Sequence, residues 1–358
     1  MKLSTPGKAT LFLPRYAISI DDPCCYPLGF MYVSSLLKEA GWKVKVLNFN
    51  LWEYDIREEF RGQDAILFTG NSEFMESNAV ARAVAADMGI ETVIGGSVAT
   101  FAPEKLSGYD SIISGEIDRH IDIDLIHWPD YDGFGIDEYH RRHGFVYMGV
   151  LASRGCPFSC SFCPHTCDYR ERDIALVGEE IMHYKSKYGA QLVCFTDNTL
   201  NVSKERFIEI CRMMKNTGIA WSAAIRTDVF DEEMAALAKD SGCVYMIVGV
   251  ESFQQGRLDS MNKRIMVEDT VRTLNLLHTY GIRYHGNIIL GMDGEDMDSI
   301  AAEIESMPKG YNVFPMLAQP YVGTRFMSAL LPEQRAPLNA LFREYAESRG
   351  KRVSPVLQ

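Results

Sequence analysis

The sequence predicts an α/β protein in which an N-terminal doubly wound parallel sheet is followed by a partial (β/α)6 barrel. Short apolar runs alternate with amphipathic segments along most of the 358 residues. This alternation is typical of parallel strands joined by helices, with both faces of the sheet covered. It is interrupted once, over residues 118–145, and then resumes for six strand–helix units, as many as a partial barrel needs.

The first predicted domain covers residues 1–117. Its apolar runs are short and bounded by turn residues, which favours strands, and two longer segments have the period of amphipathic helices. We expect strands over residues 9–14, 43–49, 64–70, 91–96 and 109–116, and helices over residues 28–41 and 75–89.

A polar and acidic linker is predicted over residues 118–145, packed on the surface. The barrel is predicted over residues 146–326, with its site at the C-terminal ends of the strands. A short helical tail is predicted over residues 327–358. We expect barrel strands over residues 146–153, 191–197, 219–226, 243–252, 281–291 and 311–320, and helices near 172–188, 203–216, 231–241, 267–280 and 295–307.

Composition excludes several classes of function. The net charge of -12 gives no basic field to attract phosphates, so we expect no binding to nucleic acid or to an anionic membrane. Pro14 and Arg15 interrupt the first apolar run, unlike a signal peptide, and no stretch of eighteen apolar residues exists. The odd count of nine cysteines disfavours a disulfide framework. These features predict a cytoplasmic protein.

The stretch "SRGCPFSCSFC" places Cys156, Cys160 and Cys163 on one predicted loop after the first barrel strand, and Cys167 follows. Thiolates bind soft metals and iron–sulfur clusters. The spacing C-x3-C-x2-C differs from the paired cysteines of zinc sites and suits a [4Fe-4S] cluster with one open iron. The alternative is a structural zinc site, completed by Cys167 or His165, in a non-catalytic binding module.

These three cysteines, with Phe162 before the last, resemble the signature of the radical S-adenosylmethionine (SAM) enzymes. The resemblance implies that Cys156, Cys160 and Cys163 hold three irons and that the fourth iron binds SAM. Reductive cleavage of SAM would then give a 5′-deoxyadenosyl radical, which abstracts hydrogen from an unactivated carbon. The cofactor carries this chemistry, while the protein positions it. A reductant such as flavodoxin or ferredoxin is implied as a partner.

Further segments at the predicted strand ends resemble the same family in order. Glu251 could instead be a structural carboxylate paired with a lysine or an arginine, and Arg226 could be that partner. "FTDN" also departs from the family's "GGE". The segments are "FTDN" (195–198), "AAIRTD" (223–228), "GVES" (249–252), "NIILGMDGED" (287–296) and "QPYVGTRF" (319–326). The SAM-binding residues that they imply are Thr196, Asp197, Asn198, Arg226 and Glu251.

The first domain resembles the cobalamin-binding domain that precedes the barrel in some radical SAM enzymes. The resemblance rests on "YPLGFMYVSSLLKEAGWKVKVLNFN" (26–50), "VIGGSVATFAPE" (93–104) and "IISGEID" (112–118). It implies cobalamin as a cofactor. No histidine precedes His120, so the D-x-H-x-x-G motif that supplies an imidazole to cobalt in other cobalamin proteins is missing.

The residues expected to line the corrin follow the third and fourth strands, where doubly wound sheets bind ligands. Glycines there allow close backbone approach. Cys24 and Cys25 could face the cobalt. The alternative is a set of ordinary turn residues in a domain that has lost its cofactor. The expected residues are Thr69, Gly70, Asn71, Ser72, Gly95, Gly96 and Ser97.

The two resemblances together imply a cobalamin-dependent radical SAM methyltransferase, in which methylcobalamin gives its methyl group to the substrate radical. A radical cyclisation, rearrangement or oxidation, with cobalamin accessory or absent, is the alternative. Because no recognition domain is evident at either end, we expect a small-molecule or short-peptide substrate. The family signature does not use Cys167, which is either a spare thiol or a donor near the site.

Overall fold

The computed structural model describes residues 5–15, 27–116, 122–164, 167–292, 294–318 and 322–324. The chain divides into two compact units, Met1–Gly149 and Val150–Gln358. Cys24, Cys25, His165, most of "QPYVGTRF" and the helical tail predicted over residues 327–358 lie outside the described residues.

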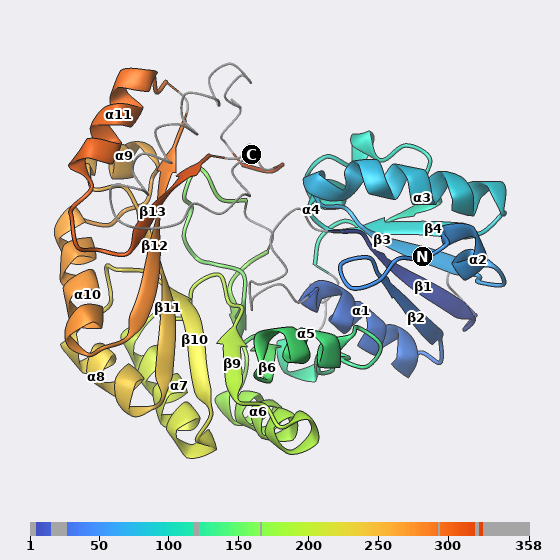
Figure 1. Ribbon diagram of the computed structural model, residues 1–358, viewed down its shortest axis with the longest axis horizontal. Coiled ribbons are helices and arrows are strands. Elements are labelled where there is room, and N and C mark those ends of the chain that lie inside the picture. The colour runs from blue at the N-terminus through green and yellow to red at the C-terminus, as the bar shows by residue number, and fades with distance from the viewer. Residues whose placement is uncertain are drawn as a thin grey trace. The chain divides into compact units, whose positions relative to one another are not determined.

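The first unit contains a five-stranded parallel sheet with the strand order β2-β1-β3-β4-β5. Helices α1 (Leu28–Glu39) and α3 (Met75–Asp87) cover opposite faces of it (Figure 1). The predicted doubly wound sheet is therefore confirmed, and its topological switch point lies between β1 and β3. The strands are β1 (Lys8–Leu13), β2 (Lys43–Asn48), β3 (Ala65–Thr69), β4 (Glu91–Gly95) and β5 (Ser111–Ile112).

Short helices that the sequence pattern did not predict fill the turns of this unit. The α2 helix (Ile56–Phe60) begins at Asp55, whose carboxylate accepts hydrogen bonds from two backbone N–H groups of the first turn. A helix of one or two turns is too short to show a period of 3.6, so only its cap is visible in the sequence. The others are η1 (Ser72–Phe74), α4 (Ser97–Phe101) and η2 (Pro103–Lys105).

The segment from residue 122 to 149 packs against the first unit. Tyr131, Phe134 and Tyr139 are buried. The carboxamide of Asn48, at the end of β2, donates to the Phe134 carbonyl at 3.1 Å and to the Tyr139 hydroxyl at 3.3 Å. The sequence predicted a linker on the surface, and its anchoring aromatic residues have no regular spacing that would reveal the docking. The segment contains η3 (Ile123–Leu125) and α5 (Ile136–His143).

The second sheet has six strands in the order β13-β12-β11-β10-β9-β6. The pairs from β9 to β13 are parallel, and β6 and β13 are the two edges, so the sheet is an open, partial barrel as predicted. Strand β6 runs across the division between the two units. The strands are β6 (Tyr147–Val150), β9 (Leu192–Phe195), β10 (Ala220–Ile225), β11 (Cys243–Glu251), β12 (Arg283–Leu290) and β13 (Val313–Leu317).

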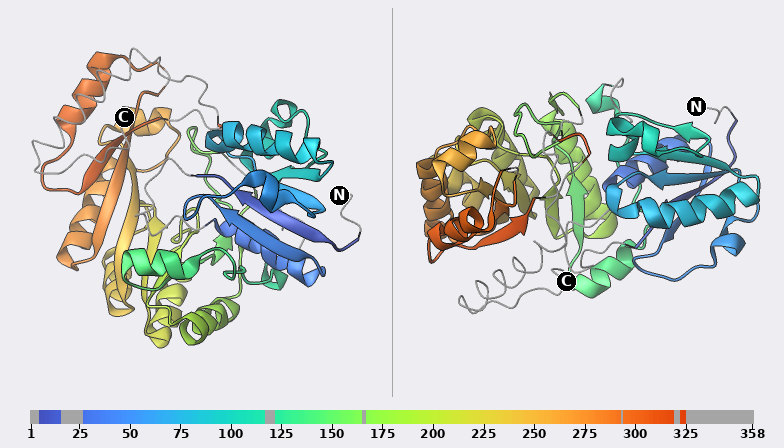
Figure 2. Two further views of the ribbon diagram at one scale, coloured as in Figure 1. Left: turned by 45° about the vertical axis from the view of Figure 1, so that its right-hand side comes forward. Right: turned by 90° about the horizontal axis from the view of Figure 1, so that it is seen from above.

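The barrel helices lie along the outer face of this sheet (Figures 1 and 2). Several begin at an Asp or Ser whose side chain accepts hydrogen bonds from the first turn, as Asp173, Ser203 and Asp231 do. Gly189 and Gly218 end two of them in the left-handed conformation. The helices are α6 (Ile174–Tyr188), α7 (Lys204–Thr217), α8 (Glu232–Asp240), α9 (Gln255–Ser260), α10 (Val267–Thr279) and α11 (Met297–Ser306).

The strands alternate between the two faces of the barrel. In β11, Met246 and Val250 are fully buried away from the site, whereas Ile247 and Gly249 are half-buried and line a cavity at the strand end; Val248 is fully buried and also borders that cavity. Side chains two residues apart share one face of a strand. The sequence thus packs one face under the helices and presents the other to the site.

Candidate functional site

The cysteines lie on a hairpin loop that two short strands close. Strand β7 (Ser153–Arg154) pairs antiparallel with β8 (Arg170–Glu171), which brings the ends of the loop together. Gly155 has a φ of +73°, and a Cβ there would lie 2.5 Å from the Asp168 carbonyl oxygen. Only glycine fits this crossing, so Gly155 lets the loop fold back on itself.

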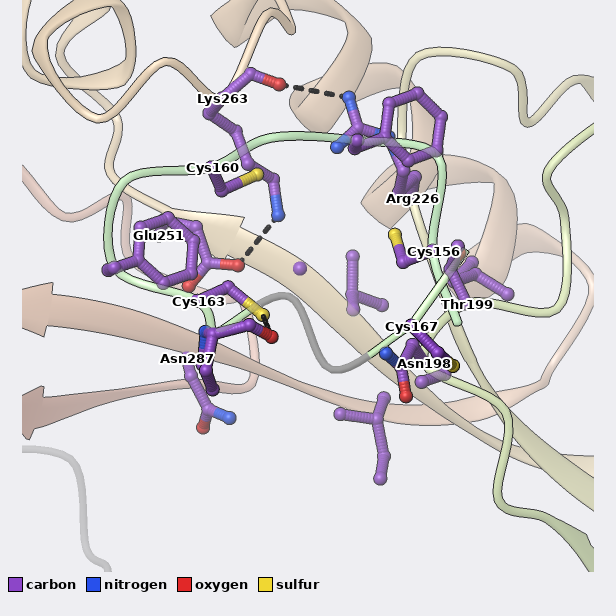
Figure 3. Close-up of a pocket in the computed structure, with 18 residues that line it drawn as sticks. Cys156, Cys160, Cys163, Cys167, Asn198, Thr199, Arg226, Glu251, Lys263 and Asn287 are labelled. Atoms are coloured by element: carbon purple, nitrogen blue, oxygen red, sulfur yellow. Dashed lines mark hydrogen bonds and ion pairs between the residues drawn. The ribbon is translucent and has the colours of Figure 1, made fainter. Parts of the chain in front are cut away.

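This hairpin loop covers a cavity at the C-terminal ends of the barrel strands (Figure 3). The cavity encloses about 230 Å³, far more than a single water needs. All four clustered cysteines line it, as do side chains from β9 to β12 and from the turn after α9. The main contributors beside the cysteines are Phe158, Phe162, Asn198, Thr199, Arg226, Ile247, Glu251, Lys263 and Asn287.

Two of the thiols in the cavity, those of Cys156 and Cys163, hold their protons firmly. Cys156, Cys160 and Cys163 are free thiols. Burial and then the neighbouring thiols raise the pKa of Cys163 to about 11, although its thiol is accessible from the cavity. Burial also raises the pKa of Cys156. A bound metal must displace these protons, because thiolates are the ligating form.

The donor set fits a cluster of soft metal ions. Sulfur is the ligand that iron–sulfur clusters and other soft metals prefer. Within the part of the chain that the structure describes, which leaves out His165, no three His, Cys, Asp or Glu side chains are grouped as around one ion. The three signature thiols instead line a space wide enough for a larger group.

The charged side chains beside the thiols are buried and paired. The ammonium of Lys263 lies 2.8 Å from a carboxylate oxygen of Glu251 (Figure 3). Arg226 forms an ion pair with Asp228 at 3.0 Å, and its guanidinium lies 3.7 Å from the centre of the Phe158 ring. Glu251 is thus paired with a lysine, which the structural alternative allowed, and Arg226 pairs with Asp228 rather than with Glu251.

Glu251 has a strained backbone. Its φ of 64° places a non-glycine residue in the left-handed region, at the last position of β11. Such a conformation costs free energy and persists only where the surroundings impose it. Here it directs the carboxylate into the cavity, toward Lys263.

Of the three residues predicted from "FTDN", only Asn198 lines the cavity. The Thr196 hydroxyl donates to the Val150 carbonyl at 3.2 Å. Asp197 is buried and accepts hydrogen bonds from the Ala152 N–H at 3.0 Å and from the Ser153 hydroxyl at 2.5 Å. Its carboxylate thus holds the start of the cysteine hairpin, and desolvation raises its pKa to about 6.

Sequence reasoning missed Thr199, Lys263 and Asn287. Thr199 lies one position beyond "FTDN", and Asn287 is the first residue of "NIILGMDGED", a segment that resembles the family but from which no SAM-binding residue was predicted. Lys263 follows Glu251 by twelve residues and reaches it because α9 turns the chain back. A motif comparison extended beyond the strand end was the only signal that could have found it.

In the first unit, the turns after β3 and β4 are joined backbone to backbone. Gly70 donates its N–H to the Gly95 carbonyl, and the Val98 N–H donates to the Gly70 carbonyl at 2.8 Å. A Cβ on Gly70 would lie 2.9 Å from the Gly95 carbonyl oxygen, and one on Gly96, whose φ is +99°, would lie 3.2 Å from the Gly70 nitrogen. These glycines allow the two turns to cross in direct backbone contact, where side chains would clash, and we name this crossing the glycine cradle.

The rest of the predicted corrin set surrounds this cradle. The Thr69 carbonyl accepts from the buried Asn78 carboxamide at 2.9 Å. The Ser97 hydroxyl donates to the Gly70 carbonyl at 3.1 Å. Asn71 is half-buried and Ser72 is exposed. A surface of backbone and small side chains suits a large flat ligand that needs close approach.

Fold and site together define a two-domain α/β enzyme: a cysteine cluster at the mouth of a partial barrel, and a doubly wound domain with a glycine cradle. Residues 150–307 match the radical SAM superfamily, and residues 21–120 match the B12 binding domain. The chain therefore combines a B12-binding domain with a radical SAM domain. The radical SAM domain implies a [4Fe-4S] cluster and SAM, and the B12-binding domain implies cobalamin.

Two methyltransferases and a cyclase are among the curated relatives of this chain. An uncharacterised methyltransferase of Pyrococcus horikoshii is 32% identical over 57% of this chain and 46% of its own length. Bacteriochlorophyllide d C-12(1)-methyltransferase of Chlorobaculum tepidum is 29% identical over 56% of this chain and 46% of its own length. Anaerobic magnesium-protoporphyrin IX monomethyl ester cyclase of Rubrivivax gelatinosus is 30% identical over 45% of this chain and 30% of its own length. The chain spans less than half the length of these relatives.

Among solved structures, the fold resembles the radical SAM methyltransferase TsrM of Kitasatospora setae. The TM-score is 0.70 with 17% identity, over 90% of this chain and 75% of TsrM. This likeness supports the assigned fold. Within the described residues, no helix has both the length and the apolar character that crossing a membrane requires.

Proposed function

We propose that this protein is a cobalamin-dependent radical SAM methyltransferase that acts on an unactivated carbon. The observation that supports it most is the cavity in which three cysteines of the family signature lie beside a buried lysine, glutamate and arginine. A purely structural metal site would have no need of buried charges around an open space.

In this proposal Cys156, Cys160 and Cys163 hold the cluster. When bound, the cluster and SAM supply a 5′-deoxyadenosyl radical, and cobalamin supplies the methyl group. The chain's own residues orient these groups. Arg226, Glu251 and Asn198 are proposed to receive the charged and hydroxyl groups of SAM, because all three line the cavity. The apolar walls exclude water from it.

Asp197 and Thr196 have a different proposed role. Their side chains bond to the backbone where the cysteine hairpin begins, so they act as positioning residues for the cluster loop. The backbone of Thr196 donates to the Val150 carbonyl at 2.9 Å, which further ties the end of β9 to β6. We therefore propose SAM contact for Asn198 rather than for all three.

Thr69, Gly70, Asn71, Ser72, Gly95, Gly96 and Ser97 are proposed to face cobalamin. The glycine cradle supports this role, since it places backbone rather than large side chains after β3 and β4, and side chains at Gly70 and Gly96 would force its two turns apart. The domain has no histidine before His120 to coordinate cobalt from below.

A radical cyclisation is the second candidate, and the relative named as a cyclase supports it. Anaerobic purification with hydroxocobalamin, followed by assay of iron, sulfide, corrin and 5′-deoxyadenosine, tests the main proposal. Bound corrin with SAM cleavage supports it. A folded protein that cleaves SAM without binding corrin would favour the alternative, and zinc without labile sulfide would contradict both.

The remaining assignments are also proposals. We propose a small-molecule or short-peptide substrate, and the names of the relatives make a bacteriochlorophyllide and a magnesium protoporphyrin the first compounds to screen. A reductant such as flavodoxin or ferredoxin would deliver the electron, and the cytoplasm is the proposed compartment. The domain limits remain those predicted from the sequence.

A further inference from the structure

The turn that follows α9 has an unusual backbone. It consists of Met261, Asn262, Lys263 and Arg264, and we name it the loop clamp. Asn262 has a φ of 51° and Arg264 a φ of 55°, so two non-glycine residues in four are left-handed. Asparagine tolerates this region, but arginine does so at a cost. Strain of this kind persists where other contacts impose it.

The loop clamp holds the cysteine hairpin on both sides of Cys160. The carboxamide nitrogen of Asn262 donates to the Ser159 carbonyl at 2.7 Å and lies 3.1 Å from the Ser159 hydroxyl. The Met261 carbonyl accepts from the Ser161 N–H at 2.9 Å. The backbone on either side of Cys160 is thereby tied to one turn that lies about a hundred residues further along the chain.

The same turn is tied to the charged groups of the cavity. The Lys263 carbonyl accepts from the Arg226 guanidinium at 2.9 Å, and its ammonium pairs with Glu251 (Figure 3). Two aromatic rings of the hairpin lie against these cations. The centre of the Phe158 ring is 3.7 Å from the guanidinium of Arg226, and the centre of the Phe162 ring is 5.7 Å from the ammonium of Lys263. One turn thus connects the cysteine loop to the ends of β10 and β11.

We propose that the loop clamp holds the cysteine hairpin in its cluster-binding conformation, and that Asn262 is its main positioning residue. This inference rests on the proposed cluster site. A loop of this length is costly to order, so contacts made before the cluster arrives reduce the entropy lost on binding. Partners that orient metal ligands typically change metal retention by about 10- to 100-fold when they are removed.

The test compares Asn262→Gly with Arg264→Gly in the reconstituted full-length protein. Both substitutions relieve a left-handed φ, but only Asn262→Gly removes the hydrogen bonds to Ser159. Arg264→Gly removes the 3.1 Å hydrogen bond from the Arg264 Nε to the Asn262 carboxamide oxygen, which helps to orient that carboxamide. Iron release to a chelator is followed anaerobically in the absence of SAM, and thermal unfolding of the metal-free proteins is measured in parallel. We expect Asn262→Gly to release iron about tenfold faster than wild type, and Arg264→Gly to release it more slowly than Asn262→Gly.

A second variant keeps the inference testable. Asn262→Asp preserves the shape of the side chain but replaces the donor with a carboxylate beside the Ser159 carbonyl, so iron release should again be faster. If Asn262→Gly fails to fold, this variant provides the test. Iron release at the wild-type rate in Asn262→Gly, or in Asn262→Asp where that variant alone folds, would overturn the clamp while leaving the proposed function intact. A wild-type protein that takes up no iron and sulfide would instead overturn the proposed function.

Discussion

The two units differ in the charge of their buried polar side chains. Among the residues that the structure describes, the buried polar side chains of the first unit are all uncharged: Thr10, Ser34, Asn48, Asn78 and Thr92. The second unit buries eight charged side chains, namely Arg172, Glu180, Asp197, Arg206, Arg226, Glu251, Lys263 and Glu303. Burying a charged side chain costs free energy unless the charge is paired, so most of these side chains lie in ion pairs.

This difference matches the ligands that the two domains imply. A corrin ring is broad and flat, so backbone and small side chains can approach it closely. SAM and an iron–sulfur cluster are charged and must be held in a fixed orientation, for which paired, immobile charges are suited. We therefore expect substitutions in the barrel to have their effect by removing a charge. We expect substitutions in the first unit to have theirs by adding side-chain volume where backbone now lies.

The largest effect is expected at the cysteines. Replacing Cys156, Cys160 and Cys163 together by alanine should abolish cluster binding and SAM cleavage, because every proposed thiolate ligand is removed. Iron and sulfide content and 5′-deoxyadenosine are measured after reconstitution. Cys167→Ala, in the same cavity, should keep the cluster. Continued 5′-deoxyadenosine formation by the triple variant would show that the signature cysteines do not hold it.

Breaking the Lys263–Glu251 pair should give the next largest effect. Lys263→Met leaves a buried carboxylate without its partner, which typically costs about 3–5 kcal/mol of folding free energy. Lys215→Met is the matched control, because its 2.6 Å pair with Asp240 is exposed and worth less than about 1 kcal/mol. Urea unfolding of the metal-free proteins measures both. Equal losses would mean that burial of the charge is unimportant here.

Asp197 should make the barrel more stable in mild acid. Its pKa is about 6 in the folded protein, above the ordinary aspartate value of 3.8. The folded state therefore binds more protons between these values, and stability falls as pH rises through that window, by up to about 3 kcal/mol. Urea unfolding at pH 4, 5 and 6 should show this dependence reduced in Asp197→Asn. Parallel curves for both proteins would contradict the assignment.

The smallest effect is expected in the glycine cradle. Gly96→Ala forces a left-handed alanine against the Gly70 backbone, at a cost of about 1–3 kcal/mol. Gly89→Ala is the control, because its φ is also positive but a Cβ there would meet open space. Only Gly96→Ala should weaken hydroxocobalamin binding, measured by equilibrium dialysis. Equal affinity in the two variants would place the corrin elsewhere.

The fold was predictable because both sheets depend on patterns of apolar residues. The strand predicted over 43–49 is β2 at Lys43–Asn48, and the helix predicted near 203–216 is α7 at Lys204–Thr217. The aromatic anchors of residues 122–149 were not predicted, because single aromatic residues without a period give no signal until their partner surface is known.

The site was predictable only where one short segment carries it. Cys156, Cys160 and Cys163 lie on one loop, so their spacing alone indicates a shared ligand. The partners of Arg226 and Glu251 depend on how the turn after α9 meets two strand ends, which sequence spacing does not encode. Asp197 shows the same limit, since its carboxylate bonds to residues about forty-five positions earlier in the chain.

The most direct test of the account is one anaerobic turnover experiment with the reconstituted protein, hydroxocobalamin, a reductant and SAM that carries a deuterated methyl group. Mass spectrometry follows the label in the corrin, and chromatography follows 5′-deoxyadenosine. The account predicts that the corrin acquires the deuterated methyl group and that 5′-deoxyadenosine is formed. Protein that contains iron and sulfide but neither methylates the corrin nor cleaves SAM would contradict it.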